Sequence, residues 1–161
     1  MKRVSKIFNN IEEYLVVILL FVMTVVVFWQ VICRFVLKAS LPWSEEISRY
    51  ILVWASFLGA SIGVKRGAHI GVEAFTMILP AKLKKFVQHF AIILSVLFCL
   101  IVFKESLSII QKQIINNQVS PAMRIPMWWA YAAIPTGMIL MAIRFLQTMV
   151  KISRHSTKEA N

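Results

Sequence analysis

The residue types that most often carry chemistry are few and scattered in this chain. Its two cysteines, Cys33 and Cys99, lack the paired spacing of a metal site or redox motif and suit buried packing positions. Of the three histidines, His69, His89 and His155, only His89 falls within a long apolar stretch. A haem held between helices normally needs two inward histidines. The sequence therefore predicts no metal, no cofactor and no enzymatic activity, with a haem-binding membrane anchor of a redox enzyme as one alternative.

The acidic residues are equally informative, because coupled carriers generally place ionisable groups near the middle of the membrane. All 7 acidic side chains are glutamates, and none lies centrally in an apolar stretch: Glu12, Glu13, Glu45, Glu46, Glu73, Glu105 and Glu159. This pattern predicts an accessory subunit that does not transport alone. A second alternative is a self-sufficient four-helix exporter. Such carriers need a carboxylate within the first helix, whereas Glu12 and Glu13 precede the first apolar stretch.

Four long apolar stretches provide the elements that must position these residues. The first, 14–33, carries no charge, and at about 1.5 Å per residue it matches a hydrocarbon core roughly 30 Å thick. The others are 51–64, 86–103 and 125–143. The stretch 51–64 is too short to cross the membrane unless the helix also includes residues before it. With 59% hydrophobic residues and a mean hydropathy of +0.74, the sequence predicts an all-α integral membrane protein. We expect four transmembrane helices in one compact bundle.

The predicted segments can be given residue bounds. An amphipathic N-terminal segment, 1–13, is expected to lie along the membrane surface, and the first stretch is too long for a signal peptide. The transmembrane helices are expected at 14–35, 43–66, 86–116 and 125–150, followed by a tail at 151–161. The third is expected to extend beyond the membrane until Asn116 and Asn117 end it. Pro135 lies inside the fourth and predicts a kink.

The net charge of +11 is explained by where the basic residues lie. Lys and Arg are more numerous before the first helix, between the second and third and after the fourth than in the other two connections. This bias predicts that both termini are cytoplasmic. Basic clusters beside a membrane favour anionic phospholipid head groups. A nucleic-acid partner is not expected, because no exposed aromatic residues are interleaved with the charges.

Small side chains recur along the second predicted helix. Ala55, Gly59, Gly63 and Gly67 are spaced four residues apart. Such a small-residue ridge lets another helix approach closely, which matters in lipid, where burying apolar surface gives little drive. The ridge therefore predicts a helix interface, either within this chain or with a second protein.

A charged and aromatic cluster stands at the start of the same helix. Trp43 suits the membrane interface, Glu45 and Glu46 suit the positive end of the helix dipole, and Arg49 is four residues from Glu45. One interpretation is a helix cap with a surface ion pair. The other is a docking site for another polypeptide or a lipid head group.

Taken together, these residues resemble the small membrane subunit of tripartite ATP-independent periplasmic (TRAP) transporters, the DctQ family. Glu73 departs from the pattern, since the family more often has Asp there. The resemblance covers about residues 30–137 and is carried by Gln30-Val31, Arg34-Phe35, Trp43, Glu45, Glu46, Arg49, Trp54, Phe57-Leu58-Gly59, His69-Ile70, Val72, Ser120-Pro121-Ala122, Ile125-Pro126, Tyr131, Pro135 and Gly137.

The resemblance implies a three-part system in the bacterial inner membrane. A periplasmic substrate-binding protein captures an organic acid, of sialic acid or C4-dicarboxylate type, and a large membrane subunit imports it with sodium. The small subunit would brace the large one, contact phospholipid and help to dock the receptor. By this resemblance, the partner interface comprises Trp43, Glu45, Glu46, Arg49, Trp54, Ala55, Gly59, Gly63 and Gly67. Structural or lipid-contacting roles fall to Arg34, His69, Pro121, Pro126 and Pro135.

Overall fold

The protein is described from a computed structural model that covers residues 2–66 and 80–158, with side chains for 10–66, 80, 83 and 86–152. Over these ranges it is helical, with one isolated β-bridge between Val119 and Pro126. Four helical segments are long and apolar enough to cross a membrane: Asn10–Phe35, Pro42–Lys65, Phe86–Ile115 and Trp128–Ile152. The predicted all-α class with four spans is confirmed. Gly67, His69 and Glu73 lie outside the described residues.

The first two helices form an antiparallel pair. Helix α1 runs from Lys2 to Phe35, so residues 2–13 continue the first span, and their lying along the membrane surface stays a prediction. Helix α2 runs from Pro42 to Lys65. Pro42 stands at its first position, where the missing N–H group leaves no hydrogen bond unmade. The short connection between the helices therefore holds them side by side.

Helix α4, from Ala81 to Ile115, is the longest described helix. It begins after Pro80 and spans about 52 Å at 1.5 Å per residue, which exceeds the hydrocarbon thickness and requires tilt or projection. Asn116 caps its end, and Asn117 follows with a left-handed φ of 45°. The expected termination of the third helix at these two asparagines is confirmed.

The fourth span is divided into two helices. A single turn, α5, covers Trp128–Tyr131, and α6 covers Ala133–Lys158. The break falls one turn before Pro135, because a proline cannot donate to the carbonyl four residues earlier, here that of Tyr131, and its ring crowds that carbonyl. Pro135 thus stands in the first turn of α6, and the kink expected inside one continuous helix is replaced by a break upstream of it.

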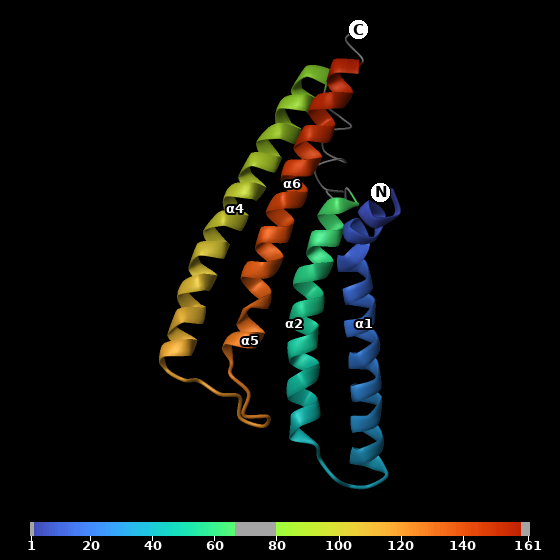
Figure 1. The fold of residues 1–161 in the computed structure, drawn as a ribbon, viewed down its shortest axis with the longest axis vertical. Coiled ribbons are helices and arrows are strands. Elements are labelled where there is room, and N and C mark those ends of the chain that lie inside the picture. Colours follow the sequence, from blue (N-terminus) through green and yellow to red (C-terminus); the bar gives the residue numbers. More distant parts are fainter. Residues whose placement is uncertain (1, 67–79, 159–161) are drawn as a thin grey trace.

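The helices form an open row. Among the described residues, the backbone of α1 comes close to α2 alone, α2 lies between α1 and α6, and α4 lies against α6 and α5 (Figure 1). The expected compact bundle is therefore wrong, because α1 and α4 do not meet. In lipid, apolar surface gains little by leaving its surroundings, so the row need not close around a core.

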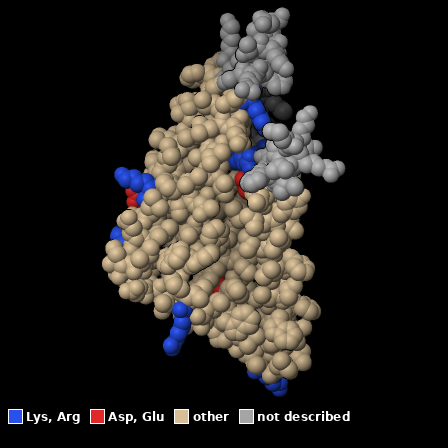
Figure 2. Space-filling model, in the orientation of Figure 1, with Lys and Arg blue, Asp and Glu red and all other residues tan. Residues whose placement is uncertain are grey.

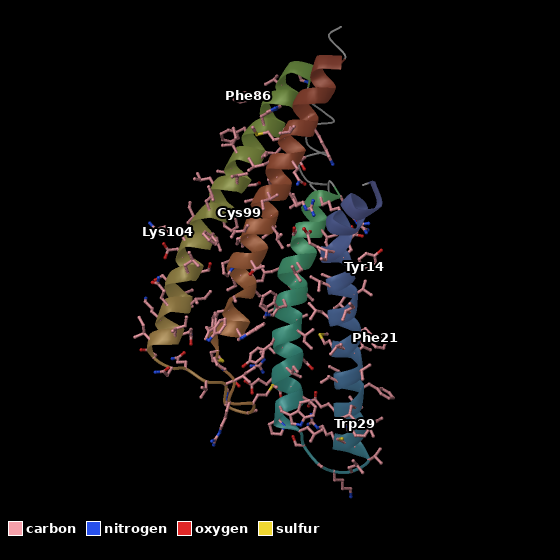
Figure 3. The ribbon with its side chains drawn as sticks, in the orientation of Figure 1. Tyr14, Phe21, Trp29, Phe86, Cys99 and Lys104 are labelled. Atoms are coloured by element: carbon pink, nitrogen blue, oxygen red, sulfur yellow. The ribbon has the colours of Figure 1, made fainter. Side chains whose placement is uncertain are left out.

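Packing within the row is concentrated beside α6. A cluster of buried side chains joins α4 to α6 through Ile92, Cys99, Met138 and Phe145. By contrast, α1 buries none of the residues in its most apolar 18-residue stretch, where Phe21 and Trp29 are exposed (Figure 3). The face shown in Figure 2 carries few charged side chains over most of its area. The two outer helices thus expose broad apolar surfaces.

Candidate subunit-contact surfaces and the polar clusters that position them

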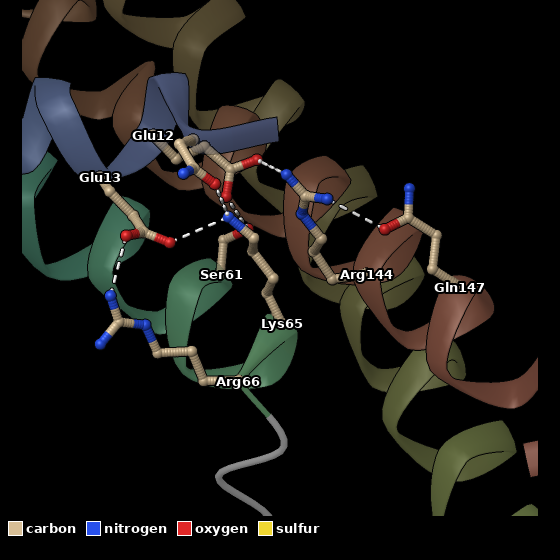
Figure 4. A network of polar contacts seen from close by, with 8 residues as sticks. Glu12, Glu13, Ser61, Lys65, Arg66, Arg144 and Gln147 are labelled. Atoms are coloured by element: carbon tan, nitrogen blue, oxygen red, sulfur yellow. Dashed lines mark hydrogen bonds and ion pairs between the residues drawn. The ribbon is translucent and has the colours of Figure 1, made fainter. Parts of the chain in front are cut away.

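A buried ion pair and a hydrogen bond to it join α1, α2 and α6. They lie toward the side of the membrane domain that carries both chain termini. Glu12 Oε1 of α1 accepts a hydrogen bond of 2.7 Å from Arg144 Nη2 of α6, and Glu12 Oε2 accepts one of 3.1 Å from Ser61 Oγ of α2 (Figure 4). Arg144 Nη1 also donates to Gln147 Oε1 at 2.9 Å. Glu12 is 4% exposed and Arg144 7% exposed. The carboxylate is therefore held by fixed donors.

A second set of contacts continues this cluster toward the end of α2. Lys65 Nζ lies 2.9 Å from both Asn10 Oδ1 and Glu13 Oε1, and Arg66 Nη2 lies 2.8 Å from Glu13 Oε2 (Figure 4). Together with Glu12, Ser61, Arg144 and Gln147, these residues form what we call the terminal-end cluster. It fixes α1 against the last turn of α2 through charge-assisted hydrogen bonds.

The terminal-end cluster is not predicted from the sequence. In the sequence, Glu12 and Glu13 precede the first apolar stretch, and Lys65, Arg66 and Arg144 count only among the basic residues that predict orientation. One sequence feature points to it. Antiparallel neighbouring helices bring the start of α1 and the end of α2 to the same depth in the membrane, and acidic residues of α1 can then pair with basic residues of α2 and α6. No ligand binding is needed to explain the cluster, because the described contacts satisfy its carboxylates.

Glu46 performs a comparable positioning role at the opposite end. Its Oε2 accepts hydrogen bonds from the backbone N–H groups of Ala122 at 2.9 Å and Met123 at 3.0 Å, and Tyr50 donates its hydroxyl to Oε1. Glu46 is buried although it lies in the first turns of α2. It therefore fastens the connection between α4 and α5 to α2, which accounts for its side chain without a second protein.

The neighbouring residues of the predicted cluster remain accessible. Glu45 and Arg49 form an exposed ion pair of 3.0 Å, and Trp43 is 40% exposed. These three side chains line a surface groove of about 510 Å³ together with Pro121. The structure thus separates the predicted cluster into an inward residue, Glu46, and an outward set that is available for contact.

A second groove, also of about 510 Å³, adjoins the first between α2 and the α5–α6 segment. It shares Glu46, Arg49 and Pro121 with the first groove. Its apolar lining includes Val53, Phe57 and Ile134. Trp54, a predicted interface residue, donates its indole N–H to the backbone oxygen of Trp129 at 3.3 Å. Its polar group therefore makes a contact within the chain. The two grooves therefore adjoin each other at this end of α2.

The small-residue ridge on α2 also divides into a buried residue, Ala55, and two more open ones, Gly59 and Gly63. Ala55 is buried, whereas a Cβ atom added at Gly59 or Gly63 would meet nothing within 4 Å. The close helix contact within the chain instead uses Gly137 of α6, where an added Cβ would lie 2.6 Å from Phe57 Cβ. No described residue therefore packs against the open positions at Gly59 and Gly63.

The other predicted site residues that the structure describes lie at the ends of α1 and α6 or in the connection between α4 and α5. Arg34 is exposed in the last turn of α1. Pro121 lines both grooves, Pro126 pairs with Val119, and Pro135 is buried in the first turn of α6. Among the described residues, no group of three or more His, Cys, Asp or Glu side chains is placed to hold a metal ion.

Residues 23–155 match the family described as tripartite ATP-independent periplasmic transporters, DctQ component. The chain belongs to this family. It is 30% identical over 167 aligned residues to the C4-dicarboxylate TRAP transporter small permease protein DctQ of Vibrio cholerae, an alignment that covers 90% of this chain and 72% of that protein. It is 35% identical over 82 residues to the sialic acid TRAP transporter small permease protein SiaQ of Vibrio cholerae, covering 51% of this chain and 47% of that protein.

A longer relative places the same segment within a larger polypeptide. The sialic acid TRAP transporter permease protein SiaT of Haemophilus influenzae is 30% identical over 142 residues, which cover 88% of this chain but 23% of that protein. As a TRAP small permease subunit, this DctQ-family chain is a transport component and not an enzyme. Its open glycines, grooves and apolar outer helices are therefore candidate contacts with other parts of a transporter.

Proposed function

We propose that this TRAP small permease is the static scaffold of a receptor-dependent importer. The observation that carries the proposal is the open row of helices, whose outer members keep apolar faces uncovered. A row without a shared interior encloses no solute pathway of its own. Laid against a large membrane subunit, the same row offers a rigid wall along which a transport domain moves.

The bonding of the acidic groups supports an accessory role. Glu12 is the most buried of the described acids of α1, and both of its carboxylate oxygens are engaged, one by Arg144 and the other by Ser61. A self-sufficient exporter requires a carboxylate that alternates between solute and proton. The fixed ion pair argues against such exchange.

We further propose that the large subunit packs against α2 on its open side. Gly59 and Gly63 leave space there for a close helix approach, and interfaces of this kind are typical of helices in lipid. The outward residues Trp43, Glu45 and Arg49, with the adjoining grooves, are proposed to contact the large subunit, the periplasmic receptor or phospholipid. Ala55, Glu46 and Trp54 would support that surface from inside, and Gly67 would extend the ridge.

The orientation and cargo complete the proposal. The excess of Lys and Arg at the end carrying both termini favours a cytoplasmic location for that end, in the bacterial inner membrane. The names of the relatives include C4-dicarboxylate and sialic acid transporters, so we propose an organic acid of one of these types as cargo. Sodium coupling is proposed from the family resemblance.

Reconstitution tests the scaffold role directly. The chain, co-expressed with the large permease protein encoded beside it, should co-purify as one complex after detergent extraction. Liposomes containing that complex, with sodium and the loaded receptor outside, should accumulate the organic acid. Liposomes containing this chain alone should not, and sodium-dependent uptake by the chain alone would overturn the proposal.

A pair of glycine variants tests the contact surface. Gly59→Leu and Gly63→Leu should leave the isolated chain folded, because nothing lies within 4 Å of either position, but should reduce recovery of the complex. Gly137→Leu is the matched control, because its side chain would strike Phe57 inside the chain and should lower the thermal stability of the chain by itself. Undiminished complex recovery in both ridge variants would remove the ridge from the interface.

A further inference from the structure

A groove separate from those at the Trp43 end lies beside the terminal-end cluster. Its volume is about 580 Å³, and it is bounded by the end of α2 and one side of α6. Three basic residues line it, namely Lys65, Arg144 and Lys151, and three apolar residues of α6 continue it: Ile143, Leu146 and Val150. The groove therefore has a cationic part and an apolar part.

The apolar part faces outward from the protein. Ile143, Leu146 and Val150 are 45%, 48% and 50% exposed, and they follow one another at helical spacing along a single stripe of α6. Lys151 comes directly after this stripe. Because α6 is long and apolar enough to span the membrane, a stripe of this kind would face lipid chains, and Lys151 lies at the end of the span, where lipid head groups begin.

The cations outnumber the carboxylates around this groove. Among the described side chains, Glu12 pairs with Arg144, and the single carboxylate of Glu13 is shared by Lys65 and Arg66. Lys151 makes no ion pair with a described side chain. Among the described side chains, four basic residues, Lys65, Arg66, Arg144 and Lys151, therefore stand against two glutamates, and the groove complements an anion whose other end is apolar.

We propose that this groove binds an anionic diacyl phospholipid. The phosphate would lie against Lys151 and Lys65, whose ammonium groups would donate charge-assisted hydrogen bonds. One acyl chain would follow Ile143, Leu146 and Val150 along α6. The bound lipid would cover the side of α6 next to the terminal-end cluster and keep water from its buried ion pair. The site is defined by membrane insertion and does not depend on the scaffold role proposed above.

Native mass spectrometry of the purified complex with the large subunit tests this site. The probes are phosphatidylglycerol and phosphatidylcholine with identical oleoyl chains, added in equal amounts, so that only the net head-group charge differs. The wild-type complex should retain phosphatidylglycerol preferentially. Lys151→Gln should reduce that preference about fivefold, since one basic residue near a membrane surface contributes about 1 kcal/mol of attraction to anionic lipid.

Lys104→Gln is the matched control, because Lys104 is an equally charged, exposed residue on α4, on the far side of the row from the groove (Figure 3). It should leave the preference unchanged. Equal retention of the two lipids by the wild type, or equal losses in the two variants, would overturn the proposal. Displacement by excess soluble glycerol 3-phosphate would also overturn it, by showing that the acyl chains contribute nothing.

Two further measurements separate this proposal from the scaffold role. The yield of the complex is recorded in the same preparations, and it should be the same for Lys151→Gln and the wild type. Retention of phosphatidylglycerol by the isolated chain but not by the complex would overturn the site in the assembled transporter, because the large subunit would then cover the groove. Retention by both supports it.

Discussion

Glu12 and Arg144 lie 132 positions apart in the sequence, yet their charged groups are 2.7 Å apart and both side chains are buried. The pair joins α1 to α6 at a level where the backbones of these helices do not come close, and Ser61 of the intervening α2 donates to the same carboxylate. A buried ion pair gains little net stability over apolar side chains, but leaving one partner alone is costly. The contact therefore fixes the relative height of three helices.

Removal of Arg144 alone should destabilise the chain strongly. Arg144→Met leaves the Glu12 carboxylate buried without its cation, and a loss of about 3–5 kcal/mol in the free energy of unfolding is expected. The double variant Glu12→Leu, Arg144→Met should recover most of that loss, since neither charge remains. Thermal unfolding of the purified chain in detergent measures both effects.

The exposed pair of Glu45 and Arg49 supplies the control for that experiment. Its contact distance of 3.0 Å is similar, but both side chains are more than half exposed. Arg49→Met should therefore change the free energy of unfolding by less than about 1 kcal/mol. Comparable losses for Arg49→Met and Arg144→Met would show that burial does not determine the cost of breaking the pair.

Glu46 should control the order of the connection between α4 and α5. Glu46→Ala removes the acceptor for the Ala122 and Met123 N–H groups, and hydrogen bonds to a charged group contribute about 1.5–3 kcal/mol. Amide hydrogen exchange at these two residues should accelerate at least tenfold. Glu45→Ala, which alters the adjacent exposed carboxylate, should leave their exchange unchanged. Equal exchange rates in the two variants would show that the Glu46 carboxylate does not hold this connection.

Features that depend on local sequence were predictable. The four spans follow from runs of apolar residues, and the end of α4 follows from Asn116 and Asn117, whose side chains tolerate the conformation seen at Asn117. The kink predicted at Pro135 is instead a break before Ala133, because the effect of a proline falls on the carbonyl four residues earlier. These features require knowledge only of neighbouring residues.

The row and its polar contacts could not be predicted in the same way. Hydropathy identifies each span but not its neighbour, and in lipid an open row costs little more than a closed bundle. Glu12 and Arg144 each look like ordinary charges at a membrane boundary until the row places them together. Likewise, spacing marked Gly59 and Gly63 but could not show that the chain leaves them uncovered while Gly137 makes the close contact.

Gly137 should tolerate even a methyl group poorly. The Cβ of Gly137→Ala would lie 2.6 Å from Phe57 Cβ, which is backbone-proximal and cannot rotate away, so α2 and α6 must separate. Overpacking of this kind costs about 1–3 kcal/mol in thermal unfolding experiments. Gly63→Ala adds the same methyl group in open space and should be neutral or stabilising by up to about 1 kcal/mol, through helix propensity. Matching losses at the two glycines would contradict the packing described here.

The orientation of the row can be tested with single cysteines. Cys33 and Cys99 are first replaced by alanine, and then either Ser40→Cys, in the connection between α1 and α2, or Lys151→Cys, near the opposite end, is introduced. Both positions are exposed. Since the end carrying both termini is the more basic, a membrane-impermeant maleimide added to spheroplasts should label the cysteine at position 40 but not the one at 151. After permeabilisation both should react, which controls for access. Labelling at 151 in sealed spheroplasts, with none at 40, would reverse the proposed orientation and place the anionic-lipid groove in the outer leaflet of the membrane.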